Sequence, residues 1–297
     1  VRGRKGVFSF SLSDLTAWVF PTGVVILVPT LEPAFPVTRA TAALAAELLV
    51  RVASGEPRFS RKFRNQRDED STMSRLRANE DSVLFSGLCG ADVRLRELMQ
   101  SVVPTEFVQT GVPRSAVFLR SPCEDPHEPL KREEVKQLVR MTTGLGGNAA
   151  IADGLVDEAV HDDGRENITF SVVRKGVGCW ARAGVDDPFV SEGNFGRNWD
   201  YNFLPLYLLC VAQSLSLRKL EQQAAAALLQ GQDLDELIAG CSILETVHLD
   251  SPARVHQHNL FFQAARSALG IEDSLQRIRA HRLSAPVRAA PSIPVRH

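Results

Sequence analysis

The sequence has few cysteines, no long apolar run and almost no net charge, and each absence excludes a class of protein. Its five cysteines are Cys89, Cys123, Cys179, Cys210 and Cys241. Their scattered positions and odd number argue against a disulfide framework or a zinc knuckle, and favour reduced thiols in a cytoplasmic protein. A formal net charge of −1 over 297 residues excludes a whole-molecule field that would attract nucleic acid or an anionic membrane.

The apolar windows are too short for a membrane span. The two most apolar stretches are residues 18–29, interrupted by Pro21 and Gly23, and residues 203–212. A spanning helix needs about 20 predominantly apolar residues, so we expect no membrane segment in this chain. The first residues also lack the apolar region of a signal peptide. We therefore expect a cytoplasmic protein.

The common catalytic signatures are missing as well. The sequence contains no Gly-x-Ser-x-Gly elbow, no His-Glu-x-x-His and no catalytic-cysteine motif. Residues 144–148 form the only glycine cluster that could cradle a phosphate, but they follow a helical pattern and predict a helix end. Cys210 and Cys241 lie in apolar helical patterns and are interpreted as core residues. No catalytic residue is assigned, and an enzyme with an unfamiliar site stays open.

The sequence signals for metal ligands are equally weak. His256 and His258 are two residues apart on a predicted helix and would point to different faces, so we interpret them as surface histidines. The acidic doublets at 162–163 and 186–187 could ligate a hard cation, but such doublets are typical of solvated turns. The residues alone identify neither a metal site nor a cofactor.

Two hairpins dominate the predicted β structure. Residues 15–20 and 24–28 are rich in β-branched and aromatic residues around a Pro-Thr-Gly turn. The second of these runs is continuously apolar, as in a strand covered on both faces. Residues 168–173 and 177–181 form another hairpin pattern around residues 174–176. A further strand is predicted at residues 115–119.

Helices fill the rest of the predicted core. Residues 130–143 form an amphipathic pattern. From residue 200 onward the pattern is almost wholly helical. The predicted segments there are 201–229, 233–247, 252–269 and 271–283. We therefore predict an α+β protein, with a mixed sheet built from the hairpins, flanking helices and a helical C-terminal half. Its expected parts are a mixed α/β domain (1–195), a helical region (196–284) that could pack on the same sheet, and a Pro/Ala-rich tail (285–297).

The long predicted helix at 201–229 carries the strongest local signal. Leu204, Leu208, Val211 and Leu215 form one apolar stripe, and neighbouring leucines widen it. Because an apolar helix must be covered by something, two interpretations stay open. The helix is a central core element, or these four residues form an assembly surface between subunits.

One segment is strongly basic. Its cations are Arg58, Arg61, Lys62, Arg64 and Arg67. Two phenylalanines lie among them, a composition suited to phosphate contact and base stacking. The acidic residues 68–70 follow at once and offset much of this field. A solvated or partner-docked loop is favoured, and binding of a nucleic acid or an acidic partner is the alternative.

Three segments resemble the cytosolic part of divergent CorA-like proteins, the family of magnesium and cobalt channels. They are residues 19–27, residues 174–178 and residues 201–220. The family's Gly-Met-Asn pore signature and its transmembrane helices are absent, so the resemblance carries no channel function to this chain. It implies an α/β cytosolic domain that assembles with copies of itself and senses a divalent cation such as Mg²⁺. None of the family's carboxylate positions matches a residue here.

The leading functional hypothesis is a non-catalytic, homo-oligomeric cytosolic domain that assembles or regulates around a divalent cation or effector. It depends on the apolar helix, the hairpins and the lack of catalytic motifs. The alternative is a subunit of a larger complex that binds a protein or, less favoured, a nucleic acid through the basic loop 58–67.

Overall fold

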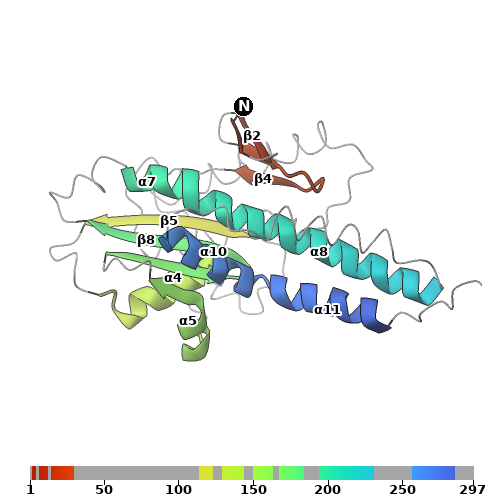
Figure 1. The fold of residues 1–297 in the computed structure, drawn as a ribbon. Helices are drawn as coiled ribbons and strands as arrows, with labels where there is room; N and C mark the ends of the chain where they lie inside the picture. The colour runs from red at the N-terminus through yellow and green to blue at the C-terminus, as the bar shows by residue number, and fades with distance from the viewer. Residues whose placement is uncertain are drawn as a thin grey trace, which may run out of the picture.

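The computed structural model describes residues 2–4, 7–12, 15–29, 114–122, 129–143, 150–162, 167–183, 194–230 and 256–284. These residues form two four-stranded sheets and several helices (Figure 1). The α+β class and the helical C-terminal half are therefore confirmed. The basic segment 58–67, the glycine cluster 144–148, the predicted helix 233–247 and the tail lie outside the described residues.

The two predicted hairpins exist, but they belong to different sheets. The first sheet is an antiparallel meander in the order β1-β2-β3-β4. Its strands are β1 (Arg2–Arg4), β2 (Val7–Leu12), β3 (Leu15–Val19) and β4 (Val25–Pro29). The sequence predicted a β4 strand covered on both faces, and this was wrong, because Val25 is 46% exposed. Apolar runs of five residues do not distinguish a buried strand from a half-covered one.

The second sheet is mixed and has the order β5-β8-β7-β6. Its strands are β5 (Ser115–Pro122), β6 (Val160–Asp162), β7 (Ile168–Val173) and β8 (Gly176–Ala183). β5 runs parallel to β8, and the other pairs are antiparallel. The parallel pair is possible because a long connection containing helices joins β5 to the strands beside it.

Helices cover both faces of this mixed sheet. On β7, Phe170 and Val172 pack toward the C-terminal helices, while Val173 packs against Val139 of helix α4 (Arg132–Thr143). Successive side chains of a strand point to opposite faces. Every residue of β7 is buried as a result. Helix α5 (Asp153–Ala159) packs beside α4 on the same side of the sheet.

Two glycines of β8 let α4 approach the sheet closely. A Cβ on Gly178 would collide with the Thr142 methyl group and lie 2.9 Å from Leu138 Cδ1. A Cβ on Gly176 would lie 2.6 Å from the Ser115 carbonyl oxygen. Because the helix lies this close, Ser115 Oγ donates to the Thr142 carbonyl oxygen in the last turn of α4, at a distance of 2.9 Å. The hydroxyl thus satisfies a carbonyl that the helix end leaves open.

The predicted long helix is α8 (Leu204–Gln230), which continues a short helix α7 (Asn194–Asn198) and a π-helical turn η1 (Trp199–Phe203). It lies between the two sheets (Figure 1). Leu208 and Ala212 pack against Phe20 of the N-terminal meander. Tyr207 and Val211 join the core formed with β7 and β8. Contact with protein on both sides explains its all-round apolar character.

Two further helices complete the core. Helix α10 (His256–Ala268) packs on β7 and α8, and helix α11 (Ile271–Ser284) runs along α8. Gly270 separates them and has φ +65°, a left-handed conformation that favours glycine. Ser214 of α8 donates to the Leu269 carbonyl oxygen at 3.2 Å in this turn. No helix in the described ranges is long and apolar enough to cross a membrane.

Candidate anion-binding site

The turn between β7 and β8 gathers basic residues at one end of the mixed sheet. Arg174 and Lys175 occupy the turn and are exposed. Arg114 lies immediately before β5, the parallel neighbour of β8, and its Nε donates to the Arg174 carbonyl oxygen at 3.2 Å. The Ser115 amide donates to the Lys175 carbonyl oxygen at 3.0 Å. These bonds hold the start of β5 against the turn and bring the cations together.

Tyr207 of α8 contacts this end of the sheet. Its side chain is 1% exposed, and its hydroxyl donates to the Val173 carbonyl oxygen at 3.4 Å. Burial raises the pKa of Tyr207 well above its ordinary value, and the nearby Arg114 guanidinium opposes that rise. The tyrosine therefore stays protonated and places Arg114 beside α8.

Arg218 lies three turns further along α8, and the charges of Arg174 and Arg114 act on it. Partial burial, followed by the charges of Arg174 and Arg114, holds the pKa of Arg218 below its ordinary value. Arg277 of α11 acts in the same direction, and Glu221 opposes it. The charges of Arg174, Arg114 and Arg277, from three other parts of the chain, thus act on Arg218 in addition to its burial.

Within the described part of the chain, the Glu221 carboxylate acts on Arg218 and opposes the lowering of its pKa. Its Oε1 accepts a bond from Arg277 Nε at 2.6 Å, and Arg277 Nη2 donates to Ser274 Oγ at 3.0 Å. The Glu221 side chain is 20% exposed, whereas that of Arg277 is 58% exposed. One acid therefore engages the outermost arginine and partly offsets the charge of the central one.

We refer to these residues as the arginine cluster: Arg114, Arg174, Lys175, Arg218, Arg277 and Glu221. These six described residues comprise five cations and one carboxylate, whereas the whole chain has a net charge of −1. Guanidinium groups match the oxygens of phosphate and carboxylate in paired hydrogen bonds. An anion placed here would relieve the mutual repulsion of the arginines.

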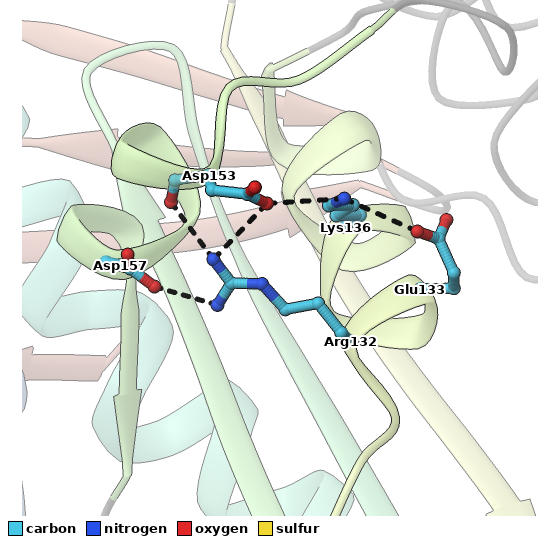
Figure 2. A network of polar contacts seen from close by, with 5 residues as sticks. All are labelled: Arg132, Glu133, Lys136, Asp153 and Asp157. Carbon is cyan, nitrogen blue, oxygen red and sulfur yellow. Dashed lines mark hydrogen bonds and ion pairs between the residues drawn. The ribbon is translucent and has the colours of Figure 1, made fainter.

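A second polar network, between α4 and α5, has a structural explanation (Figure 2). Arg132 Nη1 contacts Asp157 at 2.7 Å, and Lys136 Nζ contacts Asp153 at 3.3 Å and Glu133 at 3.4 Å. The Lys136 hydrogen bond is the main reason that the pKa of Asp153 is below its ordinary value. Three carboxylates compensate the two cations, so this network joins α5 to α4.

The predicted assembly residues lie in intrachain contacts. Leu208 faces Phe20 and Val211 lies in the shared core, whereas Leu204 and Leu215 are partly buried at its edges. Other elements of the same chain thus cover the apolar stripe of α8, as expected if α8 is a core helix. A role of the four residues in assembly stays a prediction.

The other predicted residues do not converge on a site. His258 lies edge-on against the Phe203 ring, with 4.8 Å between centroids, and Asp162 ends β6. Within the described part of the chain, no group of three or more His, Cys, Asp or Glu side chains could hold a metal ion. Cys210 is fully buried, which confirms it as a core residue. Residues 58–67 and Cys241 lie outside the described residues.

Comparison with known proteins gives no family assignment. No protein-family model matches the chain, and neither the curated proteins nor the solved structures compared with it give a match. The residues of the arginine cluster, with their contacts and charges, therefore provide the basis for a functional proposal.

Sequence reasoning missed the arginine cluster because its members are far apart in the chain. Arg114, Arg174, Arg218 and Arg277 lie in four segments that are more than 40 residues apart in the sequence. The local signals were the Arg174-Lys175 and Arg218-Lys219 pairs, and such pairs are also ordinary on exposed turns and helix faces.

Proposed function

We propose that this chain is a binding module whose arginine cluster holds an anionic group of the phosphate type. The observation that carries the proposal is the convergence of Arg114, Arg174 and Arg277 on the partly buried Arg218. Gathering like charges destabilises a fold, and such departures from the ordinary arrangement concentrate at functional sites. Arginine forks bind phosphate with geometric specificity that lysine does not provide.

Binding of orthophosphate, measured by isothermal titration calorimetry at low ionic strength, tests this function. Replacing Arg218 by Gln removes the central cation, and we expect a loss of affinity of about fivefold or more. Lys219→Gln is the matched control. It removes one positive charge from the next position of α8, about 100° around the helix and exposed.

The outcomes separate the cluster from general charge attraction. Loss of affinity in Arg218→Gln but not in Lys219→Gln supports the proposed site. Equal effects of both substitutions would show that phosphate responds to overall charge only, and the proposal would fail. Added salt should weaken binding in the native chain, because the ligand and the arginines are partly exposed to solvent.

A second candidate is the CorA-like homo-oligomer that responds to a divalent cation. One observation favours it: α8 and α11 continue side by side beyond the strands of the mixed sheet (Figure 1), and Leu229 on this extension is 90% exposed. A leucine exposed at this place is available for a contact between subunits. Native mass across a range of protein concentrations, with and without magnesium, tests it. A cation-sensitive oligomer is expected, and a monomer under every condition would reject it.

A further inference from the structure

A groove lies between helix α10 and strand β6, the outer strand of the mixed sheet on the side opposite β5. Its volume is about 490 Å³, within the range of about 300–1,000 Å³ typical of clefts that hold ligands. On the α10 side it is lined by Gln257, Leu260 and Ala264, which recur every three or four residues and so share one helix face. On the sheet side it is lined by Val160 and His161 of β6.

Phenylalanine rings form the floor of this groove. Phe170 of β7 and Phe261 of α10 line it and are almost completely buried. Their ring centroids are 5.2 Å apart, and the Phe203 ring packs against both, at 4.6 Å from Phe170 and 5.2 Å from Phe261. Rings at such distances hold one another in a close-packed arrangement. The floor of the groove is therefore already formed before any ligand arrives.

The groove lining is polar in part but carries no fixed charge. None of its residues is Asp, Glu, Lys or Arg, and its polar members are His161, Gln257, Gln263 and Ser267. An ionic ligand would lose its hydration here without gaining an opposite charge. Glutamine amides both donate and accept hydrogen bonds, as the amide groups of a peptide do. The lining is thus complementary to an uncharged ligand that combines amide groups with apolar groups.

Strand β6 offers a free edge next to the groove. Among the described strands it pairs with β7 only, so backbone N–H and C=O groups on its outer edge face away from the sheet. His161 is paired with Phe170, and residues directly opposite each other in a ladder point to the same face of the sheet. A peptide residue paired with His161 on the outer edge would also point to this face. Its side chain would then enter the groove beside α10.

We infer that the groove between α10 and β6 binds an extended peptide segment, which pairs with β6 as a further strand and places an uncharged aliphatic side chain over Phe170 and Phe261. In strand addition, backbone hydrogen bonds hold the peptide and pockets for alternate side chains select it. Because β6 has three residues, it offers few backbone bonds, and the side chain in the groove must contribute much of the affinity. The groove shares no residue with the arginine cluster, so this inference is independent of the proposed function.

Fluorescence anisotropy of a labelled peptide, titrated with the full chain, tests the inference. The probe is a short capped peptide of alternating leucine and threonine, and we expect it to bind saturably. Replacing its leucines by aspartates should lower the affinity at least about tenfold, because the burial of a leucine side chain is lost. Methylating all its backbone nitrogens removes the N–H donors that pair with β6. This change should also lower the affinity at least about tenfold.

Variants of the chain locate the binding site. Ser267 lines the groove and is exposed, so Ser267→Trp should fill the groove and lower peptide affinity at least about tenfold. Gln276→Trp adds the same ring at an exposed position of α11 and should have no effect. Leu260 and Leu229 are both exposed leucines, but only Leu260 lines the groove. Leu260→Ser should therefore lower the affinity about fivefold, and Leu229→Ser should not change it.

Circular dichroism of each variant, compared with that of the native chain, detects any loss of folding. If the native chain does not bind the alternating peptide, or if the two control substitutions weaken binding as much as the groove substitutions, the inference is wrong. If the fully methylated peptide binds as tightly as the unmodified one, strand pairing with β6 is overturned. If N-acetylleucine amide binds as tightly as the peptide, the groove takes small uncharged amides rather than a strand. Ser267→Trp should leave orthophosphate affinity unchanged, so each proposal can fail without the other.

Discussion

Replacement of Gly178 by alanine provides a sharp test of the fold, because this glycine lies where α4 approaches the mixed sheet. The added methyl group would collide with the Thr142 methyl and lie 2.9 Å from Leu138 Cδ1. Thr142 cannot rotate away without cost. Its hydroxyl contacts Ser171 Oγ at 2.9 Å and donates to the Val139 carbonyl oxygen at 3.0 Å.

The expected loss of stability follows from three contributions. Overpacking of a close-packed site costs about 1–3 kcal/mol. Loss of one buried hydroxyl contact at Thr142 adds about 1 kcal/mol. Alanine also lowers the conformational entropy of the unfolded chain, which stabilises the folded state by about 0.5–1 kcal/mol. The free energy of unfolding should therefore fall by about 2 kcal/mol in Gly178→Ala.

Urea denaturation followed by circular dichroism measures this change, with Gly154→Ala as the matched control. Gly154 lies in helix α5, and a Cβ there meets nothing within 4 Å. Alanine at this helical position should raise stability by up to about 1 kcal/mol. Gly176→Ala should cost more than Gly178→Ala, because its Cβ meets backbone oxygens of Ser115 and Thr142 that cannot rotate away. Equal midpoints for Gly178→Ala and the native chain, with an unchanged denaturant slope, would refute the close-packing argument.

Three further predictions concern the core, the α4–α5 network and a buried thiol. Leu208→Ala should lower the free energy of unfolding by about 2–5 kcal/mol without changing the native mass; a smaller oligomer would instead support the assembly interpretation. The pKa of Asp153 is lowered chiefly by Lys136, so its contribution to stability is present above the ordinary carboxyl pKa and is lost as the pH falls through the lowered value. NMR titration should show Asp153 moving back toward about 3.9 in Lys136→Met, and an unchanged value contradicts the contact. Burial raises the pKa of the Cys210 thiol, so iodoacetamide should alkylate it only in urea; peptide mapping that finds native labelling would show that the core opens.

Much of the fold was predictable because its signals are local. The β7–β8 hairpin, β5 and helices α4 and α11 occur where the residue patterns predicted them. Period-2 and period-3.6 patterns report which side of an element is apolar, and they require only neighbouring residues. The same patterns could not assign the N-terminal hairpin to a separate sheet. Its apolar residues are equally compatible with one sheet that includes the second hairpin and with a sheet of their own.

The candidate site was not predictable, because no single segment contains it. Arg218 and its neighbour Lys219 lie in a largely apolar helix, and Arg277 lies in a second helix with Arg279 and Arg282. Neither segment by itself indicates the other. Arg174 and Arg277 act on Arg218 only because α8 packs on the mixed sheet and α11 runs along α8. The basic residues that the sequence emphasised, such as Arg61 and Lys62, lie outside the described residues.

The sequence by itself determined the α+β class, the hairpins and the need to cover an apolar helix, because backbone preference and hydrophobic period are properties of short segments. Only the tertiary structure decided what covers that helix, α8. A sheet packs on each side of it, with Phe20 against Leu208 and β7 against Tyr207. It also decided where charge accumulates. Electrostatic repulsion acts through space, so only the folded chain brings arginines from three other segments near Arg218.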